Sequence, residues 1–194
     1  MPQTHTDDLT PARNSSVHTY TDDGGPRALR VISIGYCRSY NTATAHFIGT
    51  AIAARYVHAN DLGGFYLLPF TLPQDMDVSQ PSSVRILVNP LQNAAINGQK
   101  VRFILQATHV PDGGSPQTST VNCNWSVPEN WTTDDCNVVL MDNGNGRTFE
   151  GNTFAEGDTV GLRLARAGSD PADTFDKAVK MADYIQFEYT AKRY

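Results

Sequence analysis

The strongest constraint on the fold of this chain is a repeated alternation of apolar and polar residues. It runs through residues 83–88, 100–108, 159–165 and 179–190. A period of two places alternate side chains on opposite faces of an extended strand. Because no segment after residue 62 shows helical spacing, the pattern predicts β-strands with one face on a core.

The segments between these strands carry turn residues. Asn-Gly pairs occur at residues 97–98 and within 143–146, and Gly, Pro and Asp are frequent at 111–114 and 168–171. Asn-Gly supplies the positive φ angles of tight hairpins. Several short strands joined by such turns predict an all-β fold, a jelly-roll β-sandwich over residues 63–194.

The first 62 residues are less regular. Residues 1–28 are rich in Thr, Ser, Asp, Gly and Pro, which predicts an N-terminal arm that is flexible or ordered only by a partner. A frayed terminus or cloning remnant is the alternative. Residues 29–62 are expected to form an extended linker and first strand region, and within them 41–60 favours extended structure over helix.

Composition excludes several classes of partner. The 15 Lys and Arg against 20 Asp and Glu give a net charge of −5, which argues against a nucleic-acid partner. The chain shows neither a signal-peptide core nor 18 consecutive apolar residues, so we expect no membrane partner. Three cysteines without a CxxC predict no disulfide framework and assembly in a reducing compartment such as the cytoplasm.

The sequence offers weak candidates for catalysis. His109 ends a strand at an inward position, but no Gly-x-Ser-x-Gly accompanies it. Glu129, Glu150 and Glu156 could in principle serve a glycosidase, although carboxylates in polar loops are normally solvated. We therefore expect no catalytic residue and no enzyme activity.

Metal sites are equally weakly supported. Cys123 and Cys136 lack the close ligand pair of zinc sites and are interpreted as isolated buried thiols. Residues 142–146 resemble half a calcium loop without its terminal Glu. Asp170, Asp173 and Asp176 cluster in one segment and could hold a weak calcium ion, but both segments are better explained as turns. We expect no metal and no cofactor.

Four residues are candidates for contacts with other molecules. Trp125 and Trp131 lie in an Asn- and Thr-rich loop, which suits a ligand-binding loop for carbohydrate or protein. The alternative is that both rings cap one end of the core. Leu87 and Ile104 interrupt polar strand faces, which predicts a subunit interface.

Three stretches carry a resemblance to a known class of proteins. They are LLPFTLPQDMDVSQPSSVRILVNP at 67–90, NGQKVRFILQATHV at 97–110, and residues 156–191, which open with Glu-Gly-Asp and close on an apolar strand. In this order they resemble the β-jelly-roll structural proteins of tailed bacteriophages, which include capsid decoration (cement) proteins and related fibre or knob domains.

The resemblance implies a structural virion protein without enzyme activity. It would form a homotrimer on the outer surface of the capsid and bind the major capsid protein through an N-terminal extended segment. The capsid-contact arm is predicted to contain Arg27, Arg30, Ile32, Ile34, Tyr36, Arg38 and Tyr40. The alternative functions are a receptor- or glycan-binding tip of a phage tail fibre, which would use the Trp125/Trp131 loop, and a jelly-roll glycan lyase or hydrolase.

Overall fold

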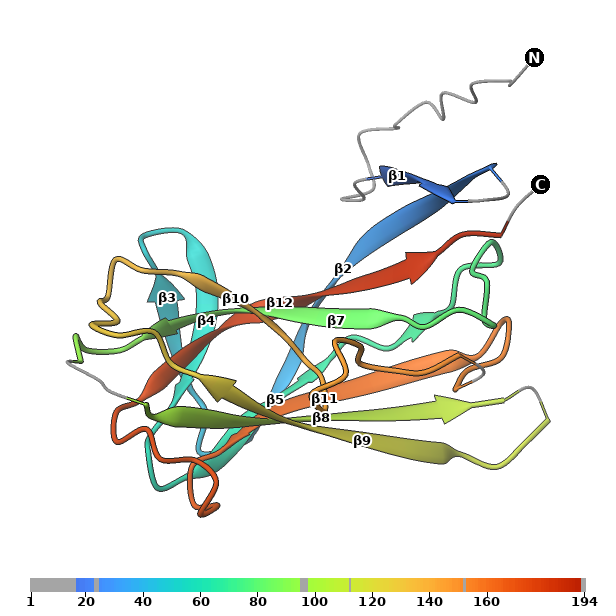
Figure 1. Cartoon of the computed structure of the whole chain (residues 1–194). Helices are drawn as coiled ribbons and strands as arrows, with labels where there is room; N and C mark the ends of the chain where they lie inside the picture. The colour runs from blue at the N-terminus through green and yellow to red at the C-terminus, as the bar shows by residue number, and fades with distance from the viewer. Residues whose placement is uncertain (1–16, 23–24, 95–97, 112, 152, 193–194) are drawn as a thin grey trace.

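The chain folds into a sandwich of two antiparallel β-sheets (Figure 1). The structure is a computed structural model that describes residues 17–22, 25–94, 98–111, 113–151 and 153–192. Residues 17–22 and 25–27 are described by their backbone alone. The strands are β1 (Val17–Asp22), β2 (Gly25–Asn41), β3 (Thr44–Ile48), β4 (Ile52–Val57), β5 (Leu62–Leu67), β6 (Phe70–Thr71), β7 (Ser83–Pro90), β8 (Lys100–Val110), β9 (Gln117–Ser126), β10 (Asn137–Leu140), β11 (Thr159–Ala167) and β12 (Val179–Thr190).

The order of the strands is that of a jelly roll. Sheet A has the order β10-β7-β12-β2, and sheet B has the order β5-β11-β8-β9. Apart from the hairpin of β8 and β9, strands adjacent in one sheet are separated in sequence by strands of the other, as two interlocked Greek keys require. The predicted all-β jelly-roll sandwich is confirmed, and 41–60 is extended, as predicted, in β3 and β4.

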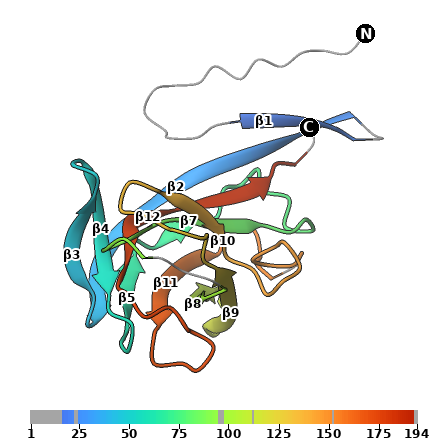
Figure 2. The same ribbon diagram turned by 60° about the vertical axis from the view of Figure 1, so that its left-hand side comes forward.

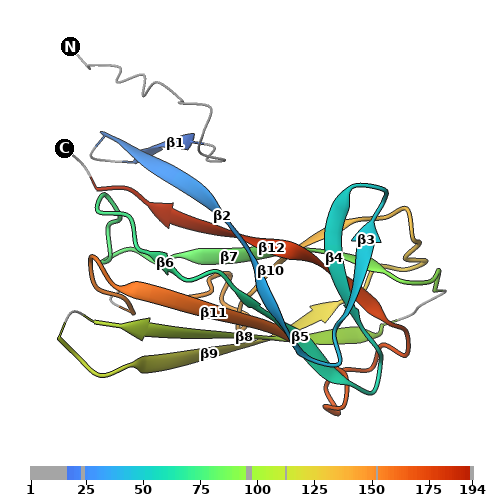
Figure 3. The ribbon, with the colours of Figure 1, turned by 180° about the vertical axis from the view of Figure 1, so that it is seen from behind.

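Strand β2 belongs to both sheets. Residues 29–35 pair with β12 in sheet A, and residues 36–41 pair with β5 in sheet B. A register shift between Tyr36 and Arg38 marks the place where the strand leaves the first sheet for the second. Figure 3 shows β2 descending from beside β12 to β5. The segment expected to be an extended linker and first strand region thus contributes most of a strand that belongs to both sheets.

Two hairpins lie outside the eight strands of the jelly roll. β1 pairs with residues 25–30, at the start of β2, and lies away from the sandwich body (Figures 1 and 2). β3 and β4 form the second hairpin, which continues sheet A because β4 also pairs with residues 179–182 of β12. Among the described residues, β3 pairs with β4 alone.

The core lies between the two sheets and explains the period of two. The inward positions of β8 and β11 are fully buried, and aromatic rings fill much of the space between the sheets. Its largest apolar members are Phe65, Leu72, Met76, Ile86, Phe103, Leu105, Trp131, Met141, Leu162, Phe175 and Phe187. Burial of this apolar surface is the main term that holds the sheets together.

A buried ion pair between Arg166 and Asp173 lies beside this core. The Arg166 side chain is 0% exposed, and its Nε and Nη2 each donate to a carboxylate oxygen of Asp173 at 2.8 Å. Nη1 donates to the carbonyls of Val57 and Lys177, and Nη2 also donates to that of Phe175. All five N–H groups of the guanidinium are therefore used. Arg166 ties the 168–178 loop to the end of β4.

Removing the carboxylate of Asp173 tests how much this buried ion pair contributes to stability. We expect Asp173→Asn to lower the free energy of unfolding by about 3–5 kcal/mol, because it leaves a buried guanidinium without its counter-charge. Asp176→Asn is the control, since Asp176 is an exposed partner of Lys177, and it should change stability by less than about 0.5 kcal/mol. Urea unfolding followed by circular dichroism measures both. Equal stabilities of the two variants would contradict the role given to Arg166.

Candidate functional site

The predicted arm residues on β2 divide between the core and the surface. Ile34 is buried, and Ile32 and Tyr36 pack against the main core. Arg30 forms an ion pair with Asp75 at 2.5 Å. These side chains hold β2 in the sandwich, so they are not displayed together for a partner, as the arm prediction would require. Arg38 and Tyr40 do reach the surface of sheet B, and the side chain of Arg27 lies outside the described part of the chain.

The two residues predicted to form a subunit interface lie on different sheets. Leu87, on β7, packs against a small apolar cluster made by Ile48, Ala54 and Ala182 of the same chain. Ile104, on β8, is half-buried on the outer face of sheet B. The β3–β4 hairpin therefore supplies much of the apolar cover that Leu87 was expected to find in a second subunit. The structure does not join the two residues into one patch.

The tryptophan loop is built as part of the core. Trp131 is 1% exposed, and its Nε1 donates to the carbonyl of Asp135 at 2.9 Å. Trp125 is half-buried, and its ring meets that of Trp131 edge to face with 5.1 Å between the ring centroids. Phe175 packs on Trp131 from another side. The prediction that Trp131 contacts a ligand is therefore corrected. Its amphipathic ring closes one end of the sandwich, which was the alternative drawn from the sequence.

The outer face of sheet B carries a groove of about 370 Å³. We call it the sheet B groove. Its lining includes Arg38 on β2, Tyr66 on β5, Gln106 and Thr108 on β8, and Gly161 and Arg163 on β11. The exposed Cys37 and Pro69 also line it, and the buried Leu67 and Leu162 lie beneath. Sequence reasoning did not find this set as a site, because its members come from four separate strands.

Strand register explains why these residues meet. Arg38 pairs with Tyr66, Tyr66 with Arg163, Arg163 with Gln106, and Gln106 with Thr120. Side chains at directly paired positions lie on the same face of a sheet. The pairing thus sets five outward side chains in one row across β2, β5, β11, β8 and β9.

The two arginines of the groove are held by tyrosine rings. The Arg38 Cζ lies 4.7 Å from the ring centroid of Tyr66, and the Arg163 Cζ lies 4.6 Å from that of Tyr40. The rings of Tyr40 and Tyr66 meet edge to face at 5.8 Å. Stacking on a ring orients a planar guanidinium and leaves the N–H groups at its edge available.

Among the arginines whose side chains the structure describes, these two alone have no carboxylate partner. Of the eight arginines whose side chains are described, six pair with Asp or Glu: Arg30, Arg55, Arg85, Arg102, Arg147 and Arg166. Within the described part of the chain Arg38 and Arg163 form no ion pair, and the lining of the groove contains neither Asp nor Glu. The Nε of Arg163 is buried without a hydrogen-bond partner. The groove is therefore locally cationic on a chain of net charge −5.

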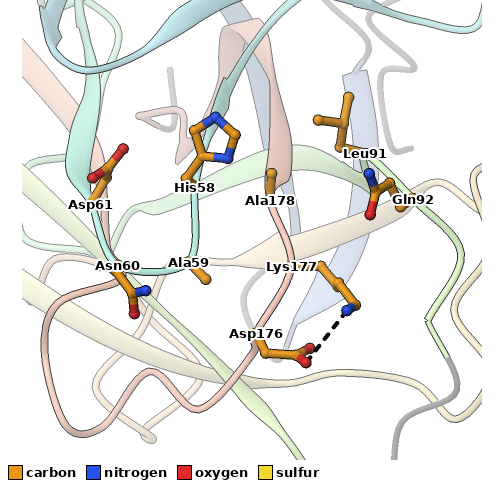
Figure 4. A pocket seen from close by; sticks show the side chains of 9 residues that line it. All are labelled: His58, Ala59, Asn60, Asp61, Leu91, Gln92, Asp176, Lys177 and Ala178. Atoms are coloured by element: carbon orange, nitrogen blue, oxygen red, sulfur yellow. Dashed lines mark ion pairs between the residues drawn. The ribbon is translucent and has the colours of Figure 1, made fainter.

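A second pocket, of about 520 Å³, lies at one end of the sandwich (Figure 4). It is formed by the loops after β4, after β7 and before β12, and it contains His58, Asp61, Asp176 and Lys177. The Lys177 ammonium points toward Asp176 and pairs with it at 3.5 Å. The positive charge of Lys177 is therefore balanced by a carboxylate within this pocket, whereas the charges of the two arginines in the sheet B groove are not.

The clustered aspartates each face a cation of their own chain. Asp170 pairs with Arg102, Asp173 with Arg166, and Asp176 with Lys177. Their carboxylates do not converge on one point, so the structure gives the calcium alternative for this loop no support. In the other segment, both oxygens of Asp142 accept backbone N–H groups, from Gly144 and Gly146, as a turn requires.

The described residues include no cluster of three or more His, Cys, Asp or Glu side chains suited to a metal ion. His109 is buried, where its Nε2 contacts Gln117 and its ring meets Phe154. All three cysteines are free; Cys123 is buried, whereas Cys136 is exposed, contrary to the expectation for that thiol. No helix in the described ranges has the length and apolar character needed to cross a membrane.

Groups with shifted pKa values are scattered and none lines the groove. Burial raises the pKa of the Cys123 thiol and lowers that of the Lys180 ammonium. Burial also raises the pKa of Asp183, against the opposing effect of Arg55. Burial and then the neighbouring Asp75 raise the pKa of Tyr189 to about 12. Desolvation is the first cause in each case, as expected for groups in a sandwich interior.

Comparisons with known proteins give only distant similarity. No family model matches the chain, and no curated protein matches it. Among solved structures, it is similar to the C-terminal family 22 carbohydrate-binding module of Clostridium thermocellum Xyn10B, with 12% identity, a TM-score of 0.39, and coverage of 80% of this chain and 85% of that one. It is also similar to a structure of infectious bursal disease virus Gt strain (12% identity, TM-score 0.34, 97% of this chain and 40% of that one). A third is the enzymatically active domain of bacteriophage CBA120 tailspike protein 4 (7% identity, TM-score 0.34, 81% of this chain and 19% of that one).

The raised pKa of Tyr189 gives a pH dependence of stability. Because the folded-state pKa of about 12 exceeds the ordinary value of 10.0, this phenol favours the folded state below pH 10. That contribution should be lost as the pH rises from 10 to about 12. We expect Tyr189→Phe to lose less stability than the unmodified chain over this interval, measured by urea unfolding at a series of pH values. Parallel curves for the two proteins would contradict the assignment.

Proposed function

We propose that this chain is a non-enzymatic structural protein of a virus particle. It forms a homotrimer that binds the major capsid protein and decorates the outer surface of the capsid. The observation that carries the proposal is that the eight-stranded sandwich is complete by itself, and the chain adds two β-hairpins outside it. Extra strands with free edges are the parts of a β-protein best suited to assembly.

The β3–β4 hairpin has the properties of a contact between copies. Phe47 is 55% exposed and Ile52 is 36% exposed, close to the tip of the hairpin. β3 contains no Lys, Glu, Asp, Arg or Pro, although such residues commonly protect an edge strand. An uncharged edge with exposed apolar side chains gains free energy when a second copy covers it. This supports self-association.

The β1–β2 hairpin suits attachment to another protein. The ladder between β2 and β12 ends at Leu29 and Thr190, and one further hydrogen bond runs from the Ala191 N–H to the Ala28 carbonyl. Within the described part of the chain, residues 25–27 therefore pair with β1 alone. The same strand continues into the core at Ile34. A load on the hairpin is thus transmitted to sheet A through continuous backbone. Three such hairpins on one trimer would bind a capsid much more tightly than one, because the second and third contacts are intramolecular.

The trimer can be tested by light scattering on a sizing column. We expect a mass of about 64 kDa, three times the 21.2 kDa of one chain. The double variant Phe47→Asp/Ile52→Asp should run as a monomer, because each subunit would bring two new carboxylates into the apolar contact. Val110→Asp, which alters an exposed valine at the end of β8, is the control and should stay trimeric. A monomeric unmodified chain would contradict the proposal.

Capsid attachment can be tested separately by co-sedimentation with purified capsids that lack the decoration protein. Deletion of residues 1–24 removes β1 but spares β2, so it should leave the sandwich folded and abolish co-sedimentation. A longer deletion reaching residue 45 would remove a core strand and would not be informative. Circular dichroism confirms folding of the shortened chain. Full co-sedimentation of that folded chain would place the capsid contact elsewhere.

A further inference from the structure

We propose that the sheet B groove binds an acidic saccharide, a chain of sugars bearing carboxylates. This function is additional to the capsid role and does not depend on it. It replaces the Trp125/Trp131 loop, of which Trp131 is buried, with Arg38, Tyr66, Gln106, Thr108, Gly161 and Arg163.

Charge selects the acidic class. Arg38 and Arg163 are the two arginines of the described residues without a carboxylate partner, and both line the groove. Each is stacked on a tyrosine ring, so the edge of each guanidinium remains free for a carboxylate. A protein with a net charge of −5 repels polyanions in general, so the attraction is confined to this face.

The neutral groups of the groove favour a sugar over other anions. Gln106 and Thr108 lie beside the arginines, and the next strand presents Thr118 and Thr120 at the paired positions. The hydroxyls of Thr108 and Thr118 share a hydrogen bond at 3.1 Å. Side-chain amides and hydroxyls can both donate to and accept from sugar hydroxyls. The groove lies on the face of the sheet, and its inner strands β5, β11 and β8 are each paired on both sides, so an acidic peptide cannot add to these strands.

Gly161 creates the space. A Cβ at this position would meet a single heavy atom within 4 Å, the Thr108 carbonyl oxygen at 3.9 Å. The missing side chain leaves a hollow in the outer face between β5 and β8, with Arg163 and Tyr66 beside it. Because Gly weakens a strand interior, its presence here fits a position where a ligand approaches the backbone.

The test is calorimetric titration of the full-length chain with three acidic probes: an oligogalacturonate, sialyllactose and a heparin oligosaccharide. We expect at least one to bind, with an affinity that falls as salt is added. For the oligogalacturonate, the methyl-esterified oligomer is the matched control, because it keeps the sugars and lacks the charge. Polyglutamate is the opposite control, because it carries carboxylates without sugars.

Three variants locate the binding. Arg163→Gln and Arg38→Gln should each weaken the bound probe by at least about tenfold, because each removes a charge-assisted contact. Arg85→Gln changes an arginine on the other sheet and should leave the affinity unchanged. Gly161→Val fills the hollow with a good strand former, so binding should be lost while the thermal midpoint stays the same or rises.

Each outcome decides the proposal. Binding that Arg163→Gln, Arg38→Gln and Gly161→Val weaken, and that Arg85→Gln leaves intact, supports it. Failure of all three acidic saccharides overturns it. Equal binding of the esterified oligomer or of polyglutamate also overturns it, because the site would then not select a charged sugar. A monomer in light scattering would contradict the trimer proposal without affecting this result.

Discussion

The structure depends on one strand that must satisfy two sheets. β2 pairs with β12 over residues 29–35 and with β5 over residues 36–41. The backbone groups of both neighbours would be left unpaired in its absence, and buried unpaired groups are costly. Its N-terminal end supports the β1 hairpin, and its C-terminal end brings Arg38 and Tyr40 to the sheet B groove. The proposed capsid contact and the groove are therefore at opposite ends of a single strand.

A buried ion pair holds one loop in place at the end of the sandwich. Arg166 joins the backbone of the 168–178 loop to β4, and Asp173 balances its charge. Phe175 in the same loop packs on Trp131, and the Arg166 guanidinium lies 5.5 Å from the Phe175 ring centroid. The loop is thus fixed by charge on one side and by aromatic packing on the other. This arrangement uses Asp173 for the ion pair and Trp131 for the core.

The sequence was sufficient to predict the strands, because one buried face imposes a period of two. The sequence could not predict that Ile32 and Ile34 pack on the core of their own chain. Alternation on β2 shows that one face is covered, but it does not show what covers that face. Arg38, Tyr66 and Arg163 form a site only through the register of three strands distant in sequence. Arg166 did carry a signal: it has the parity of Val160, Leu162 and Leu164, so a charge at an inward position required a buried partner.

The central claim is that β2 is a permanent member of both sheets and not a linker ordered by a partner. Hydrogen–deuterium exchange of the isolated full-length chain tests this directly. We expect the amides of residues 29–41 that donate to β12 or β5 to be protected to within about tenfold of those in β12, because they open only when the sandwich opens. Exchange of residues 29–41 at the rate of an unstructured peptide, with β12 still protected, would contradict the account.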